Sequence, residues 1–143
     1  MNNKSNEYFG RYISILYRQA NVFYSKELSK FGIGAGQYIF MIHLYKNDGI
    51  NQEELSELVN IDKGTTAKAI KKLEELGYIE RNRDLDDKRV NRIYLTKKSF
   101  DIKKEFLASL EKWEGMLTSN LSSEEILYGL KLLNKLTQNV TNN

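Results

Sequence analysis

The feature of this sequence that most restricts its fold is a change in the spacing of its apolar residues. Up to Gly77 they recur every three to four positions, as on the buried face of a helix. Residues 78–81 and 92–96 instead alternate with period two, as β-strands do, and helical spacing returns from about Ser99. The polar residues 82–89 separate the two alternating segments. The sequence therefore predicts a mainly α-helical protein with one small β-hairpin that has a long charged turn.

Residues at the ends of the apolar stretches divide the helical parts of the chain. Asn51 and Asp62 each suit a helix N-cap, Ser122 begins a capping box, and Gly32 suits a helix C-terminus. Asn60 tolerates the left-handed backbone that a tight turn requires. These signals predict helices over residues 9–31, 35–46, 51–59, 62–76, from about 99, and from 122.

Composition argues against several classes of function. The chain has no Cys and one His, His43, so the usual zinc and iron–sulfur ligand sets are missing, and no catalytic constellation stands out. We therefore expect no enzyme, no metal and no cofactor. The sequence has neither a run of apolar residues long enough to span a membrane nor a signal peptide, so we expect a cytoplasmic protein. The net charge of +3 says little about nucleic acid, because residues 51–96 hold nine basic and ten acidic side chains.

The outward face of the helix predicted over residues 62–76 suits contact with DNA. Gly64 and Ala67 are small enough to let the backbone approach DNA closely, and Lys68 and Lys71 can reach phosphates or guanine edges. In a helix-turn-helix, the second helix enters the major groove in this way. The alternative is an ordinary solvated helix face. The candidate DNA-binding residues of this segment are Lys63, Gly64, Thr65, Ala67, Lys68, Lys71 and Lys72.

The turn of the predicted hairpin holds a second group of basic residues. Lys88 and Arg89 lie at its tip, with Arg92 just beyond. A protruding β-ribbon with Arg at its tip can reach the minor groove of DNA. The aspartates of this turn can cap it, and Asp87 can orient Arg89 through a charge-assisted hydrogen bond. The alternative is a charged, flexible loop.

Three segments, taken in order, resemble one known family. They are residues 31–38, at the junction of the first two helices; residues 55–74, the two short helices and their turn; and Asp87-x-Arg89 with Leu95-Thr96, in the hairpin. This set resembles the MarR family of bacterial regulators, and the resemblance covers roughly residues 9–136.

The resemblance implies a triangular dimer that binds pseudo-palindromic operators, often as a repressor that a small ligand relieves. It implies that Arg89 enters the minor groove, and that bases and phosphates are met by Lys63, Gly64, Thr65, Ala67 and Lys68. The chain departs from the family pattern at several positions: Ser56 for a small Ala, Asn60 for a Gly, Ala67 for a hydroxyl residue, and Arg83 and Leu85 for wing prolines.

Other features of the sequence bear on alternative functions. The net charge of −1 over residues 51–96 suits a winged-helix module that binds proteins instead of DNA. The glycines of residues 32–36 follow a helix and lack the spacing of a dinucleotide-binding loop. The absence of Cys and the single His argue against a redox or metal sensor of the same fold. Six tyrosines in the first two helices suit either an aromatic ligand pocket or core and dimer packing, and packing is favoured.

The sequence thus predicts a winged helix-turn-helix lobe together with a helical dimerisation region. We expect residues 35–96 to form the DNA-binding lobe, and residues 1–34 and 97–143 to form a homodimer interface. The terminal helices contain more large apolar side chains than one small lobe can bury. We expect the partners to be double-stranded DNA, a second copy of the chain and a small-molecule effector.

Overall fold

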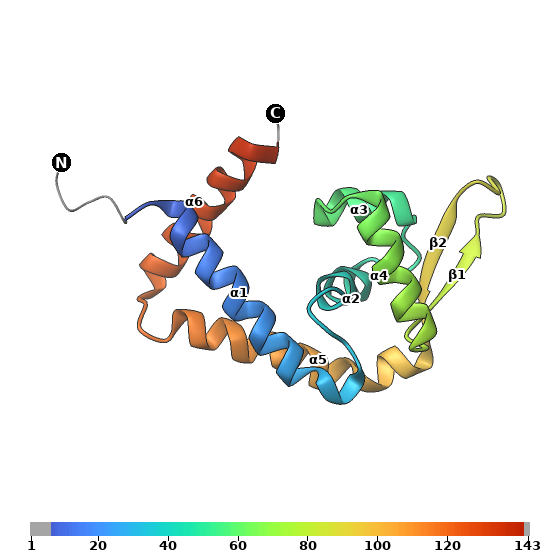
Figure 1. The fold of residues 1–143 in the computed structure, drawn as a ribbon, viewed down its shortest axis with the longest axis horizontal. Coiled ribbons are helices and arrows are strands. Elements are labelled where there is room, and N and C mark those ends of the chain that lie inside the picture. The colour runs from blue at the N-terminus through green and yellow to red at the C-terminus, as the bar shows by residue number, and fades with distance from the viewer. Residues whose placement is uncertain (1–6, 142–143) are drawn as a thin grey trace. The chain divides into compact units, whose positions relative to one another are not determined.

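The computed structural model describes residues 7–141 and is mainly helical, with one hairpin. Its elements are α1 (Phe9–Glu27), the 3-10 helix η1 (Ser29–Phe31), α2 (Tyr38–Lys46), α3 (Gln52–Val59), α4 (Lys63–Glu75), β1 (Ile79–Arg83), β2 (Asn91–Leu95), α5 (Lys97–Thr118) and α6 (Ser123–Thr141). This order confirms the fold class expected from the sequence (Figure 1). The chain forms two compact units, residues up to Ser109 and residues from Leu110, and α5 contributes to both.

The first unit has a core built around α2, α3, α4 and the hairpin. Phe40 and Leu44 of α2, Leu55 of α3, Ile70 of α4 and Ile93 of β2 are completely buried. On the side of α4 opposite the expected outward face, Thr66, Ala69, Ile70 and Leu73 are buried. This burial fixes which side of α4 faces solvent.

The turns around α3 and α4 form as the cap residues predict. The side chains of Asn51 and Asp62 accept hydrogen bonds from the backbone of their own helices, so both are N-caps. Asn60 adopts a left-handed conformation with φ 55°, and Gly77 follows α4 with φ 84°. The Tyr78 N–H then bonds back to the Leu73 carbonyl, which ends α4 and directs the chain into β1.

Two helix boundaries near the first junction differ from the expectation. The first helix ends at Glu27, and the residues up to Phe31 form η1 instead of a further α-helical turn. The second begins at Tyr38 and not at Ala35, because the Gly34 N–H is bonded to the Gln37 side chain and the Gly34 carbonyl accepts from the Gln37 N–H. These local hydrogen bonds hold the residues before Tyr38 in turns.

The hairpin is an antiparallel pair whose base is joined to the loop before α3. Ile79 pairs with Leu95, and Arg83 pairs with Asn91. The Ile93 N–H also donates to the Ile50 carbonyl, beside an isolated bridge between Asn51 and Arg92. The hairpin's base is thus tied to the segment that begins α3, while its turn extends beyond the helices of this unit (Figure 1).

The second unit contains the end of α5 and the whole of α6. A reciprocal capping box opens α6, since the Ser122 N–H donates to the Glu125 carboxylate and the Glu125 N–H donates to the Ser122 hydroxyl. Leu127, Leu130 and Leu133 of α6 are 71%, 60% and 51% exposed. None of the described helices is long and apolar enough to cross a membrane.

Candidate nucleic-acid interface

The outer face of α4 presents the small and basic residues expected from the sequence. Six of the seven candidates are exposed and the seventh, Ala67, is partly exposed. Asp62 shapes the start of this face, because its carboxylate accepts hydrogen bonds from the Thr65 N–H (2.8 Å) and from the Thr65 hydroxyl (2.7 Å). These two bonds hold the pKa of the Asp62 carboxyl below its ordinary value. The Thr65 hydroxyl hydrogen is therefore already donated within the protein.

Lys63, the first residue of α4, is paired with an acidic residue of α3. Its Nζ lies 2.6 Å from Oε1 of Glu53, and both side chains are largely exposed. The hydrogen bond and the opposite charge lower the pKa of Glu53 and raise the pKa of Lys63. Sequence reasoning gave Glu53 no role, because nothing in the local pattern places a residue of one helix beside a residue of the next.

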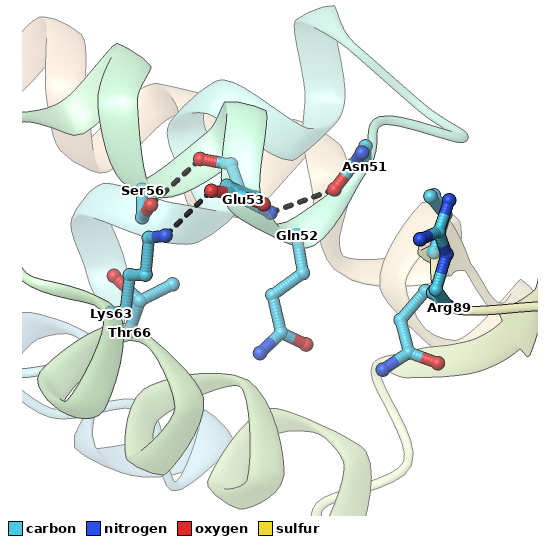
Figure 2. A pocket seen from close by; sticks show the side chains of 9 residues that line it. Asn51, Gln52, Glu53, Ser56, Lys63, Thr66 and Arg89 are labelled. Carbon is cyan, nitrogen blue, oxygen red and sulfur yellow. Dashed lines mark hydrogen bonds and ion pairs between the residues drawn. The ribbon is translucent and has the colours of Figure 1, made fainter.

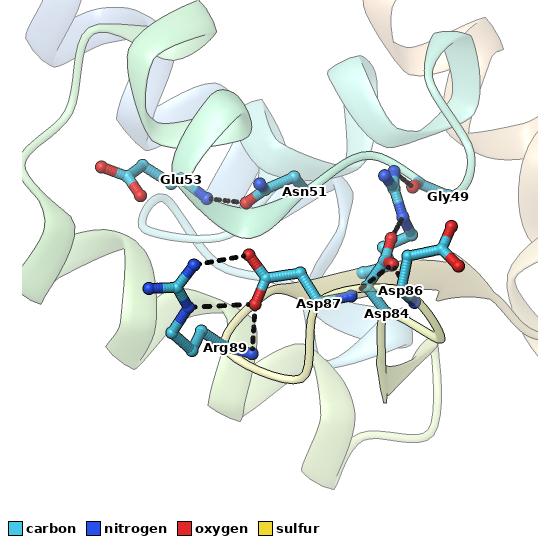
Figure 3. Close-up of polar contacts among 8 residues, drawn as sticks. Gly49, Asn51, Glu53, Asp84, Asp86, Asp87 and Arg89 are labelled. Carbon is cyan, nitrogen blue, oxygen red and sulfur yellow. Dashed lines mark hydrogen bonds and ion pairs between the residues drawn. The ribbon is translucent and has the colours of Figure 1, made fainter.

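Arg89 projects from the wing turn and is held by Asp87. Its Nε lies 3.0 Å from Oδ1 of Asp87 and its Nη2 lies 3.1 Å from Oδ2, so the two groups form a bidentate pair (Figure 3). The Arg89 side chain is nevertheless 90% exposed. The Asp87 carboxylate also accepts from the Arg89 N–H, and these bonds lower the pKa of Asp87. The hydrogen bond expected between this pair is present.

The rest of the wing turn is organised by Asp84. Its Oδ1 accepts from the backbone N–H groups of Asp86 and Asp87, and its Oδ2 accepts from Nε of Arg92. Arg92 also donates through Nη1 to the Gly49 carbonyl at 3.1 Å. Arg92 was grouped with the basic residues of the turn from sequence. The structure instead engages it with the hairpin and the loop before α3, while Lys88 stays exposed.

A polar hollow of about 180 Å³ lies between the first turns of α3 and α4 and the wing (Figure 2). Lys63 and Thr66 line it from α4, and Arg89 lines it from the wing. Gln52 extends into this region from the start of α3, and its Oε1 is buried without a hydrogen-bond partner in the described part of the protein. Gln52 was not identified from the sequence, because it reads there only as a helix-start residue.

The structure also bears on metal binding, on His43 and on the tyrosines of the first two helices. Within residues 7–141, no group of three or more His, Asp or Glu side chains is placed to hold a metal ion. Burial and the nearby Lys46 lower the pKa of His43. The rings of Tyr24 and Tyr38 stack with centroids 4.2 Å apart. The Tyr45 hydroxyl donates a hydrogen bond to the Ser99 carbonyl.

Two short helices joined by a left-handed turn, followed by a β-ribbon with an exposed Arg, define a winged helix-turn-helix protein. Residues 22–106 match the sequence family described as transcriptional regulator SarA/Rot. An HTH-type transcriptional regulator BilQ of Clostridium symbiosum is 34% identical over 128 residues, which cover 90% of this chain and 89% of the relative.

Solved structures of transcriptional regulators are similar to this chain as well. A MarR transcriptional regulator from Methanosarcina mazei is 38% identical with a TM-score of 0.85, over 92% of this chain and 97% of that one. A MarR protein from Peptoclostridium difficile is 30% identical with a TM-score of 0.92, over 99% and 93%. The chain belongs to the MarR family of winged helix-turn-helix regulators, as its sequence resemblance indicated. It is a DNA-binding transcriptional regulator of the MarR/SarA type.

Proposed function

We propose that this regulator binds a specific pseudo-palindromic operator as a homodimer and represses transcription, with a small ligand releasing it. The observation that carries the proposal is the pairing of an exposed, basic and small-residue face on α4 with an exposed, carboxylate-held Arg89 on the adjacent wing. The α4 face suits the major groove, and the wing Arg suits the minor groove beside it.

The proposed DNA contacts follow from this geometry. Lys68, Lys71 and Lys72 supply positive charge along α4, and Gly64 with Ala67 allows close approach of the helix. Lys88 adds a phosphate contact next to Arg89. A Listeria monocytogenes protein with this fold, 24% identical and with a TM-score of 0.90, was solved in complex with a 26mer DNA.

Dimerisation is proposed from the apolar surface of the terminal helices. On α1, Phe9, Tyr12 and Leu16 are 67%, 49% and 48% exposed, and α6 separately exposes the leucines described above. Large apolar side chains exposed at helical spacing on one chain suit burial against a second copy. We therefore assign residues 1–34 and 97–143 to dimerisation and residues 35–96 to DNA binding, in a cytoplasmic protein. Light scattering of the purified protein should give twice the chain mass of 16.7 kDa.

The specificity of DNA binding can be tested directly. Wild-type protein is used to select duplexes from a random library, and the duplex upstream of the protein's own gene is measured beside the selected one by fluorescence anisotropy. An enriched palindrome bound about a thousandfold more tightly than a scrambled duplex is expected. The complex should also weaken steeply with salt, because phosphate contacts release counterions.

The alternative is a winged-helix module that binds a protein instead of DNA. The excess of acidic side chains over residues 51–96 motivates it, including Glu53 beside Lys63. It predicts no enriched sequence, a flat salt series and no difference between the operator candidate and the scrambled duplex. That set of results would overturn the proposal of operator binding.

A further inference from the structure

Arg92 is a basic side chain of the hairpin that donates hydrogen bonds to two acceptors within the protein. Its Nε donates to Oδ2 of Asp84, and its Nη1 donates to the Gly49 carbonyl in the loop between α2 and α3. The side chain of Asp84 is 15% exposed and that of Arg92 is 39% exposed. The pair is thus much better shielded from water than the Asp87–Arg89 pair, whose Arg89 is 90% exposed.

Asp84 links this ion pair to the turn that presents Arg89. While Oδ2 accepts from Arg92, Oδ1 accepts from the Asp86 N–H (2.8 Å) and from the Asp87 N–H (3.1 Å). The Asp87 carboxylate in turn accepts three hydrogen bonds from Arg89. Figure 3 shows the aspartates, Gly49 and Arg89 in this arrangement. An unbroken series of contacts therefore joins the loop before α3 to the Arg89 guanidinium.

The turn depends on these hydrogen bonds for its shape. It contains no proline to fix a backbone angle. Within it, the Asp84 N–H donates to the Val90 carbonyl and the Val90 N–H donates to the Asp87 carbonyl. Asp84 is thus bonded through both its backbone and its side chain. Without Arg92, its carboxylate would lose the ion pair that fixes its orientation, and the amides of Asp86 and Asp87 would lose a fixed acceptor.

We propose that Arg92, acting through Asp84, is a positioning residue for DNA binding that holds Arg89 in place without contacting DNA itself. This inference rests on the proposed contact of Arg89 with DNA. Two consequences separate positioning from a direct contact. Loss of Arg92 should matter only while Arg89 is present. Lys should not replace Arg92 well, because an ammonium lacks the planar fork that reaches two acceptors in fixed directions.

The test is a double-mutant cycle measured by fluorescence anisotropy. The probe is the duplex enriched by wild-type protein or, if no sequence is enriched, an A·T-rich mixed-sequence duplex. The variants are Arg92→Gln, Arg89→Ala and the double variant, with Arg83→Gln as a control that removes one exposed charge from the same hairpin. Circular dichroism and thermal melts check that each variant is folded. Positioning predicts that R92Q and R89A each weaken binding by about tenfold and that the double variant is no weaker than R89A alone.

Two further variants keep the test decisive if R92Q is unstable. Arg92→Lys preserves the charge and should still lose most of the affinity, whereas a phosphate contact would tolerate it. Asp84→Asn should weaken binding in the same direction as R92Q, although it removes a negative charge.

Each other outcome has a defined meaning. Additive losses in the double variant, or full affinity in R92K, would mean that Arg92 contacts DNA and would overturn the positioning role. Unchanged affinity in R92Q would also overturn it. Unchanged affinity in R89A would instead refute the proposed contact of Arg89, and the positioning role with it.

Discussion

Lys63 at the start of α4 and Glu53 in the first turn of α3 form an ion pair, with Nζ 2.6 Å from Oε1, across the two helices of the helix-turn-helix. Both side chains are mostly exposed, so the pair adds little to folding stability. The pair matters instead for DNA binding. Lys63 is proposed to contact a phosphate, and its ammonium group is already paired with the Glu53 carboxylate. We therefore expect Glu53 to compete with the DNA backbone for Lys63.

Replacing Glu53 with Gln should strengthen DNA binding. The change frees Lys63 and removes one negative charge from the interface, so we expect an affinity gain of about two- to fivefold at low salt, which shrinks as salt rises. Anisotropy titrations at several salt concentrations measure this. Glu75→Gln removes the same charge from the exposed end of α4 and serves as the control. An equal gain in both variants would show that net charge, and not the release of Lys63, is responsible.

Replacing Lys68 with Ala should weaken binding to all duplexes by a similar factor. We expect roughly a tenfold loss and a salt dependence whose slope falls by about one, as for the loss of one phosphate contact. Lys104→Ala, on the exposed side of α5, is the matched control. If the affinity loss of K68A instead depended on the identity of one base pair of the operator, Lys68 would be assigned to a base edge.

Tyr78 joins the beginning of the hairpin to the first helical junction, and its hydroxyl should contribute to stability. It is 2% exposed and donates to the Phe31 carbonyl at 2.6 Å. Tyr78→Phe leaves that carbonyl without this donor, so the free energy of unfolding should fall by about 1–3 kcal/mol in urea denaturation. Tyr128→Phe, at a side chain that is 63% exposed, should change it little. Equal stability of Y78F and wild type would contradict this role.

Asn60 occupies a left-handed position, and substitutions there should separate backbone strain from side-chain contacts. With φ at 55°, Asn60→Ala should destabilise the protein by about 1 kcal/mol, whereas Asn60→Gly should be tolerated. Thermal melts of the two variants are the measurement. If both lost the same stability, the Asn side chain and not the backbone conformation would be the important feature.

Acid should weaken the wing turn through Asp84. Hydrogen bonds from Arg92 and from the turn amides lower its pKa in the folded protein, so its contribution to stability is present above the unfolded value of about 3.9 and is lost as pH falls through the folded value. Asp84→Asn removes this contribution, so wild type and D84N should differ in melting temperature at pH 7 and converge toward pH 3. A constant difference between them over that range would rule out this titration.

Much of the fold follows from local sequence. Asn51, Asp62 and Ser122 cap the helices as their side chains predict, and Asn60 turns the chain between α3 and α4. The errors lie where short-range hydrogen bonds compete with helix continuation, as at Gly34 and Gln37 before α2. Apolar spacing alone cannot resolve that competition, because it does not report which backbone hydrogen bonds form.

Only part of the candidate site could be predicted from the sequence. The outer face of α4 follows from helical periodicity, and the Asp87–Arg89 pair lies two residues apart, so both could be predicted. Whether these residues contact DNA stays a prediction. Gln52 and Glu53 were not identified. The hollow that Gln52 lines is completed by residues of α4 and the wing, and Glu53 is paired with Lys63 of the next helix.

The sequence by itself determined the order of the helices, the hairpin and the side of α4 that is exposed, because periodicity, caps and turn residues act over a few positions. Only the tertiary structure decided the hydrogen-bond partners of Arg92. In the sequence it is one more cation near a basic turn. In the fold, the hairpin base is bonded to the loop before α3, which brings the Gly49 carbonyl and Asp84 to the same guanidinium. The partners of a charged side chain depend on which distant segments packing brings beside it.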